Sequence, residues 1–327
     1  MRVAYFDCFA GLSGEMLLGA LVGSGLSLEA LNATLSALPL LGYSLDSQMV
    51  ARKEHSGTYL RVAHTAASLQ VSGRTHVSNG HSPQASPQSA TPESIITDSR
   101  LPNVIKQTSL AIFGRLRRAE AAVFPHNSVA AAESFSPEAV ITVIGVVTAL
   151  ALLGINRVEC SPLQVGTGIT RTAGGIGPSL SPMTAEILRT AAVPVYGSQL
   201  PGELVTPVGA AIMVTVASAW GPIPAMKIGS VGYGAGKDDL VQTPNLVRLF
   251  IGETNGDIWA LTTGHQSGIL TPTQADHVSP VAKQAEAVHA EVEVAASNSR
   301  PYIAKEDEWV ALTIKGHQQS GRQRLAS

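Results

Sequence analysis

A polar group of side chains lies near the amino terminus, between a short apolar run and a helical pattern. Asp7 falls near the end of the run over residues 2–9, and Ser13 and Glu15 follow it. Amides at the start of a helix point outward and favour anions, so a strand-to-helix junction is a common place for a ligand site. We predict such a site at Asp7, Ser13 and Glu15. Helix capping by Ser13 beside a surface carboxylate is the alternative.

A second polar group precedes another helical pattern. Thr206 stands directly before Pro207, which is typical of an N-cap followed by proline at the first helical position. Thr206 is therefore predicted to cap a helix. Glu203 adds a carboxylate three residues earlier, and a functional role for it depends on the family resemblance described below.

Two glycine-rich stretches are weak evidence for phosphate binding. Residues 229–237 read GSVGYGAGK, but Val231 stands where the first glycine of a P-loop belongs, and Asp238 replaces its Ser or Thr. We therefore reject a P-loop. Gly166 and Gly168, with the pair 174–175, favour turns over close approach to a ligand.

The segment over about residues 66–93 is rich in Ser, Gln, Thr, Pro and Gly and has few apolar side chains. Such a composition does not offset the entropy of ordering, so we predict a flexible loop. His64, His76 and His81 lie in or near this loop. A solvated loop is favoured over a histidine tract that collects a metal.

Composition excludes several classes of partner. With 22 basic and 24 acidic residues, the formal net charge of −2 gives no reason to expect nucleic acid or an anionic membrane. Cys8 and Cys160 have neither disulfide-framework nor zinc spacing, and the amino terminus lacks a signal peptide, so we expect a cytoplasmic protein. The apolar run 139–154 is shorter than the roughly 20 residues of a membrane span and predicts a buried helix.

The elements that position these residues predict an α/β fold, with mixed α and β structure in one main domain over residues 1–253. Apolar periodicity and capping residues indicate the boundaries. Strands are expected over residues 2–9, 43–50, 58–65 and 157–160, and helices after Ser13, after Ser27, over 103–123, after Ser136 and after Thr206. Strand and helix signals continue through residues 202–220 and 247–253. Residues 254–327 are expected to be a remnant or tail, largely unstructured.

Three separated segments carry a resemblance to a known family. They read YFDCFAGLSGEMLLGAL at 5–21, PVYGSQLPGELVTPVGAA at 194–211 and GYGAGKDDLVQTPNLVR at 232–248. In that order they resemble the LarC family of nickel insertion proteins, over about residues 1–253. The resemblance implies a lyase that inserts nickel into pyridinium-3,5-bisthiocarboxylic acid mononucleotide, forming the nickel-pincer cofactor and consuming CTP with a divalent cation.

The resemblance also implies site residues. It assigns no catalytic residue. The residues expected to bind substrate are Asp7, Ser13, Glu15, Glu203, Thr206 and Asn245, and the expected metal ligand is Glu133. Besides the mononucleotide, we count a separate carboxy-terminal LarC half and a second copy of the chain among the candidate partners.

This sequence departs from the family at several histidines. Alignment on Gly145 retains Glu133, but Ala130 and Ala132 stand where the family has histidine, and Gly174 replaces another. Alanine and glycine cannot donate to a metal. A catalytically inactive LarC-like scaffold or ligand-binding subunit is therefore the alternative function. An unrelated small-molecule binding module is a third hypothesis.

Overall fold

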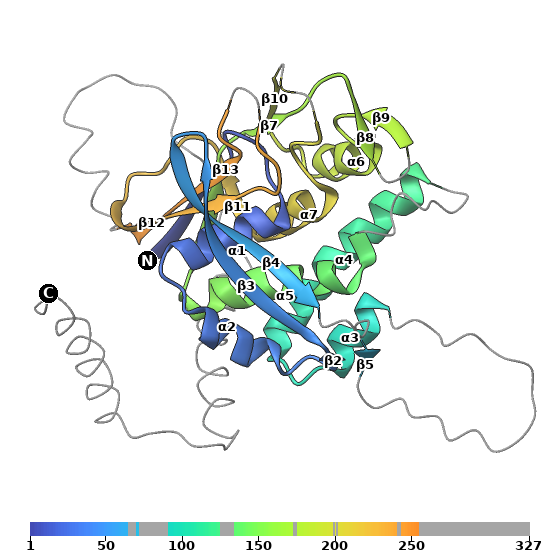
Figure 1. Cartoon of the computed structure of the whole chain (residues 1–327), viewed down its shortest axis with the longest axis vertical. Helices are drawn as coiled ribbons and strands as arrows, with labels where there is room; N and C mark the ends of the chain where they lie inside the picture. Colours follow the sequence, from blue (N-terminus) through green and yellow to red (C-terminus); the bar gives the residue numbers. More distant parts are fainter. Residues whose placement is uncertain are drawn as a thin grey trace, which may run out of the picture. The chain divides into compact units, whose positions relative to one another are not determined.

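The computed structural model describes residues 1–64, 70–71, 91–124, 134–172, 175–198, 200, 202–240 and 243–254. These residues all belong to the first of two compact units, Met1–His289; the second, Ala290–Ser327, falls outside the described residues. Figure 1 shows the arrangement of the described helices and strands. The predicted tail from residue 255 onward and most of the loop predicted over residues 66–93 lie outside the described residues.

A seven-stranded mixed sheet forms the centre of the fold. Its strand order is β11-β6-β1-β13-β12-β4-β3. The bounds are β1 Arg2–Asp7, β3 Tyr43–Arg52, β4 His55–His64, β6 Arg157–Cys160, β11 Ala217–Trp220, β12 Lys227–Ala235 and β13 Leu246–Glu253. β6 runs parallel to β1 and β11, whereas β13 runs antiparallel to β1 and β12. The mixed α and β fold class is thus confirmed.

Seven helices appear in the described residues. They are α1 Gly14–Gly23, α2 Leu28–Leu35, α3 Pro92–Asp98, α4 Asn103–Val123, α5 Pro137–Leu152, α6 Pro182–Thr190 and α7 Pro207–Val216. Ser13, Ser27, Ser136 and Thr206 each accept a hydrogen bond from the backbone amide three residues on, which satisfies an unpaired donor of the helix start. All four caps were predicted from sequence and are confirmed.

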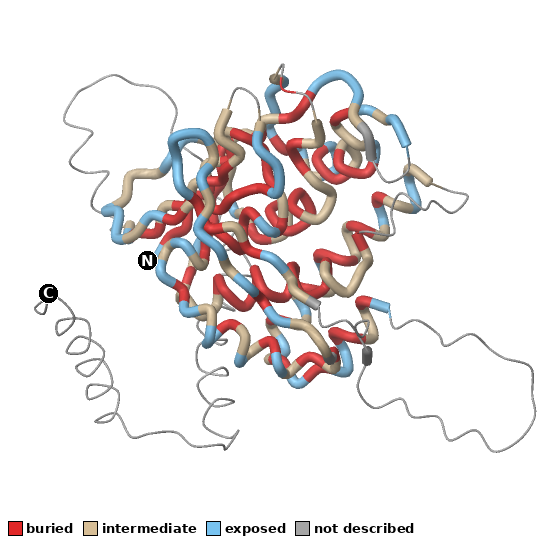
Figure 2. Tube along the Cα trace, viewed as in Figure 1, coloured by how far each residue is buried: buried red, intermediate tan, exposed pale blue. Residues whose placement is uncertain are grey.

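Helix α5 is the apolar centre of the helical layer. All its residues from Ala139 to Leu150 are buried, and it packs against α1, α2, α4 and α7. Figure 2 shows this buried helix beneath the sheet. The prediction of a buried helix is confirmed. Within the described part of the chain, no helix is long and apolar enough to cross a membrane.

Helix α1 lies directly on the sheet because glycines remove the side chains between them. A Cβ atom built on Gly234 would lie 1.7 Å from the Met16 carbonyl oxygen, and one on Gly232 would lie 2.0 Å from that of Ala20. The stretch 229–237 is therefore mostly strand β12, whose glycines accommodate a helix. This bears out the rejection of a P-loop, which requires a phosphate-binding loop that opens a helix.

Two helices, strand β12 of the main sheet and several short strands were missed by the sequence analysis. Helix α3 begins inside the segment predicted as loop, because Thr91 caps it, Pro92 opens it and Ile95 and Ile96 are buried. Helix α6 was not predicted either. The short strands pair as β2 Leu40–Leu41 with β5 Gln70–Val71, β7 Leu163–Val165 with β10 Val195–Gly197, and β8 Ile169–Thr172 with β9 Gly175–Pro178.

Candidate functional site

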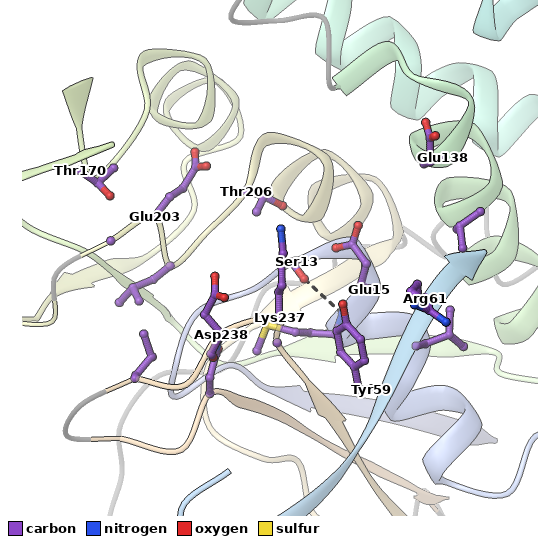
Figure 3. Close-up of a pocket in the computed structure, with 18 residues that line it drawn as sticks. Ser13, Glu15, Tyr59, Arg61, Glu138, Thr170, Glu203, Thr206, Lys237 and Asp238 are labelled. Atoms are coloured by element: carbon purple, nitrogen blue, oxygen red, sulfur yellow. Dashed lines mark hydrogen bonds between the residues drawn. The ribbon is translucent and has the colours of Figure 1, made fainter. Parts of the chain in front are cut away.

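A cavity of about 830 Å³ opens beside the starts of α1 and α7. Segments far apart in the sequence line it, from α1, β4, α5, β8, the segment before α7 and the loop after β12. Its polar lining residues are Ser13, Glu15, Tyr59, Arg61, Glu138, Thr170, Glu203, Thr206, Lys237, Asp238 and Asn245. Figure 3 shows most of these side chains converging on the cavity.

The starts of α1 and α7 are held side by side by backbone hydrogen bonds. The Leu12 amide donates to the Leu204 carbonyl at 2.7 Å, and the Thr206 amide donates to the Leu12 carbonyl at 2.9 Å. Leu12 and Val205 thereby form a parallel bridge outside the main sheet. The cap residues of the two helices, Ser13 and Thr206, both reach the cavity as a result.

Two glycines make this close approach possible. A Cβ atom on Gly11, which has φ +103°, would lie 2.1 Å from the Leu204 carbonyl oxygen. One on Gly209, in the first turn of α7, would lie 2.7 Å from the Leu12 carbonyl oxygen. Both distances are below van der Waals contact, so larger residues would push the two helix starts apart.

The loop after β12 is fixed by two side chains. The Arg52 guanidinium donates to the carbonyls of Gly236, at 2.7 Å, and of Lys237, at 3.1 Å. The Asn245 amide donates to the carbonyl of Asp238 at 2.7 Å. Each carbonyl from residue 236 to 238 thus accepts a side-chain hydrogen bond, and the loop presents Lys237 and Asp238 to the cavity.

Four carboxylates and two cations line the cavity. The carboxylates belong to Glu15, Glu138, Glu203 and Asp238. Of the cations, Arg61 also pairs with Asp46 at 3.3 Å, on a surface where both side chains are more than half exposed. The cavity can therefore hold a ligand that carries charges of both signs.

Five of the six predicted substrate-binding residues come together at this cavity. They are Ser13, Glu15, Glu203, Thr206 and Asn245. Their role in binding substrate stays a prediction. Asn245 in addition positions the loop after β12, because its side chain holds the Asp238 carbonyl.

The sixth residue, Asp7, does not line the cavity. Its carboxylate pairs with Arg248, which faces it across the antiparallel strands β1 and β13, at 2.6 Å. Partial burial by itself lowers the pKa of Arg248, but the hydrogen bond and the charge of Asp7 outweigh it and raise that pKa. Asp7 thus lies apart from Ser13 and Glu15, because strand β1 carries its side chain to a different partner. Its role in binding substrate stays a prediction.

No metal centre is visible in the described residues: they contain no group of three or more His, Cys, Asp or Glu side chains that could hold a metal ion. The predicted metal ligand Glu133 lies outside the described residues, as do Ala130, Ala132 and Gly174. Its role stays a prediction. His76 and His81 also lie outside them.

The two cysteines form a buried pair away from the cavity lining. Their Sγ atoms lie 3.5 Å apart, on the ends of the neighbouring strands β1 and β6. Burial, followed by the hydrogen bond with Cys8, raises the pKa of Cys160 well above its ordinary value. Both thiols are free, and the raised pKa of Cys160 keeps its thiol protonated and therefore a poor metal ligand.

Sequence reasoning missed the two cations, Arg61 and Lys237, and the two acids Glu138 and Asp238. Lys237 and Asp238 lie within the third family segment, 232–248, but there they were weighed only as parts of a P-loop. Arg61 lies on an amphipathic strand, where nothing in the alternation of side chains separates a ligand-facing cation from a solvated one. The presence of Lys237 in a shared segment was the usable signal.

The fold and the cavity define an α/β protein with a polar, charged binding site formed by two helix starts and a fixed loop. The family model described as "Nickel insertion protein" matches residues 4–293. The chain belongs to this family. No solved structure matches it.

Curated relatives agree with this assignment. One is the pyridinium-3,5-bisthiocarboxylic acid mononucleotide nickel insertion protein of Desulfitobacterium hafniense (strain DSM 10664 / DCB-2), 38% identical over 255 residues. Its namesake in Geobacillus kaustophilus is 35% identical over 255 residues. Each alignment covers 77% of this chain, and the chain spans only 59% and 60% of the lengths of these relatives.

Proposed function

We propose that this chain inserts nickel into pyridinium-3,5-bisthiocarboxylic acid mononucleotide to form the nickel-pincer cofactor. One observation carries the proposal: all three segments that resemble the LarC family line the same cavity. Segment 5–21 supplies Ser13 and Glu15, segment 194–211 supplies Glu203 and Thr206, and segment 232–248 supplies the fixed loop.

The chemistry of the cavity supports this substrate. Its volume of about 830 Å³ falls within the range of small-molecule sites. The substrate carries a positive pyridinium ring together with a negative phosphate and two negative thiocarboxylates, and the cavity offers both cations and carboxylates. The thiocarboxylate sulfurs of the substrate are soft donors that suit nickel. We therefore propose that the substrate itself supplies sulfur ligands for nickel, its co-substrate.

The remaining parts of the proposal concern co-substrates and location. We propose that the reaction consumes CTP with a divalent cation and takes place in the cytoplasm, both of which rest on the family resemblance. Glu133 remains the candidate metal ligand contributed by the protein. The test below is therefore run both with and without the part of the curated relatives that this chain does not match.

The test is nickel transfer by the purified chain. Nickel retained by the mononucleotide after treatment with a chelator is measured by mass spectrometry. Reactions are run with and without CTP and Mg²⁺, and with and without the part of the Desulfitobacterium relative that this chain does not match. We expect the wild-type chain to transfer nickel, and we expect the amount transferred to fall in Glu203→Gln and in Glu133→Ala. Glu253→Gln, an exposed glutamate at the end of β13, is the matched control.

A failure of transfer would favour the alternative function. If the relative transfers nickel and this chain transfers none in any reaction, the chain is a LarC-like scaffold or ligand-binding subunit. Nickel titration by calorimetry, with and without the mononucleotide, then shows whether metal binding is lost with transfer.

A further inference from the structure

Lys237 differs from the other cation of the cavity in its surroundings. Arg61 already faces Asp46 at 3.3 Å. Within the described part of the chain, no acidic side chain forms an ion pair with the Lys237 ammonium. An ammonium in a ligand cavity with no carboxylate partner is suited to bind an anionic group of the ligand.

The backbone beneath Lys237 is fixed before any ligand binds. Arg52 holds the carbonyls of Gly236 and Lys237, and Asn245 holds that of Asp238. The Gly236 amide in turn donates to the Asn245 carbonyl at 2.9 Å. A fixed loop lowers the entropy lost when the ammonium engages a ligand, because only the lysine side chain has to be ordered.

Lys237 shares its part of the cavity with the two helix starts. Figure 3 shows its side chain extending toward the region bounded by Ser13 and Thr206, the cap residues of α1 and α7. Both helices are ten residues long, and the partial positive charge of their first turns adds to that of the ammonium. Glu15, in the first turn of α1, offsets part of this charge, so the Lys237 ammonium is the group that favours an anion here.

We propose that Lys237 binds the phosphate of the mononucleotide, beside the starts of α1 and α7, and so fixes the orientation of the substrate. The inference rests on the proposed function for the identity of the ligand. With the phosphate at Lys237, the pyridinium ring and its two anionic thiocarboxylates lie in the rest of the cavity. The thiocarboxylate sulfurs, which are the proposed nickel ligands, are then held away from Lys237.

The experiment compares the mononucleotide with its nucleoside, prepared by phosphatase treatment, by calorimetry without nickel. We expect the wild type to bind the mononucleotide at least about tenfold more tightly, the size of one charge-assisted hydrogen bond. Lys237→Gln should remove this preference and leave nucleoside affinity unchanged, whereas Lys237→Arg should retain it. Lys227→Gln, an exposed lysine at the start of β12, is the matched control.

The outcomes separate this inference from the proposed function. Equal affinity of the wild type for both ligands, a preference that survives in Lys237→Gln, or binding of neither ligand overturns the inference. A preference that Lys237→Gln removes supports it even where nickel transfer fails, in which case the proposed function alone is wrong. Thermal melts of the variants confirm that each remains folded, as expected for an exposed side chain.

Discussion

Gly209 stands where α7 approaches the loop that leads into α1. A Cβ atom there would lie 2.7 Å from the Leu12 carbonyl oxygen and 2.9 Å from Ser13 Cα. We expect Gly209→Ala to lower the free energy of unfolding by about 1–3 kcal/mol, the cost of overpacking, and to weaken mononucleotide binding by separating the helix starts. Urea denaturation and calorimetry measure the two effects.

A second helical glycine provides the control with the opposite sign. Among the described residues, a Cβ atom on Gly114, inside α4, meets only Arg118 Nη1 at 3.5 Å, which is ordinary contact. Gly114→Ala should therefore raise the free energy of unfolding by about 0.5–1 kcal/mol, because alanine favours the helix interior. If Gly209→Ala and Gly114→Ala had the same free energy of unfolding, the close approach of α7 to the Leu12 carbonyl would not be what determines the geometry of the site.

A substitution at Asp7 tests whether the ligand site extends beyond the cavity. Its carboxylate pairs with Arg248 rather than with the cavity, and the Asp7 side chain is 20% exposed. We expect Asp7→Asn to lower the free energy of unfolding by about 1 kcal/mol through loss of a charge-assisted hydrogen bond. Mononucleotide affinity, measured by calorimetry, should not change. A tenfold loss of affinity without loss of stability would show that Asp7 contributes to ligand binding.

At the scale of elements, local signals were readable from sequence and long-range contacts were not. The caps Ser13, Ser27, Ser136 and Thr206 were predicted because each accepts a hydrogen bond from a backbone amide only three residues along the chain. A cap and its helix start are therefore neighbours in the sequence. Strand β12 was missed for the opposite reason. Its glycines indicate turns locally, and only the carbonyls of α1, more than 200 residues earlier, explain them.

The same distinction explains how much of the site was predicted. Ser13 and Thr206 were identifiable as helix starts, and family resemblance added Glu203 and Asn245. The side chain that fixes the loop after β12 belongs to Arg52, 184 residues earlier than Gly236 in the sequence. No periodicity or motif relates the two, so this part of the site required the fold.

The Arg52 contacts lead to a prediction about the loop itself. Arg52→Gln removes the donors to the Gly236 and Lys237 carbonyls. We expect mononucleotide affinity to fall by roughly three- to tenfold as the base of Lys237 loosens, with nucleoside affinity unchanged. Calorimetry with both ligands measures this. Equal losses for the two ligands would mean that the loop shapes the whole cavity rather than the position of Lys237.

For the whole molecule, the cavity exists only when the sheet and helices are assembled. Its lining runs from Ser13 to Asn245 in the sequence, so the unfolded chain presents no such site. A ligand that binds only the folded state stabilises it, by about 2.7 kcal/mol at a concentration of 100 times Kd. We expect the mononucleotide to raise the Tm of the wild type and of Lys227→Gln, and to raise that of Lys237→Gln much less. Equal shifts in all three proteins would contradict binding through Lys237.

Alkaline pH should destabilise the folded chain through two tyrosines, the buried Tyr5 and the half-buried Tyr43. Burial raises the pKa of Tyr43 to about 12, and burial together with the charge of Asp7 raises that of Tyr5 to about 12. Folding keeps these phenols protonated, whereas the unfolded chain ionises near pH 10. The stabilisation is therefore complete below pH 10 and is lost as the pH rises from 10 toward 12.

Tyr43→Phe isolates one of these contributions. The Tyr43 hydroxyl donates to the Leu35 carbonyl, so the variant should lose about 1 kcal/mol at pH 7. Because phenylalanine does not ionise, its free energy of unfolding should fall less steeply than that of the wild type between pH 10 and 12. Urea denaturation of both proteins across this range measures the difference, in which the other titrating groups cancel. Parallel curves would show that Tyr43 ionises equally in the folded and unfolded states, and that its burial does not stabilise the fold.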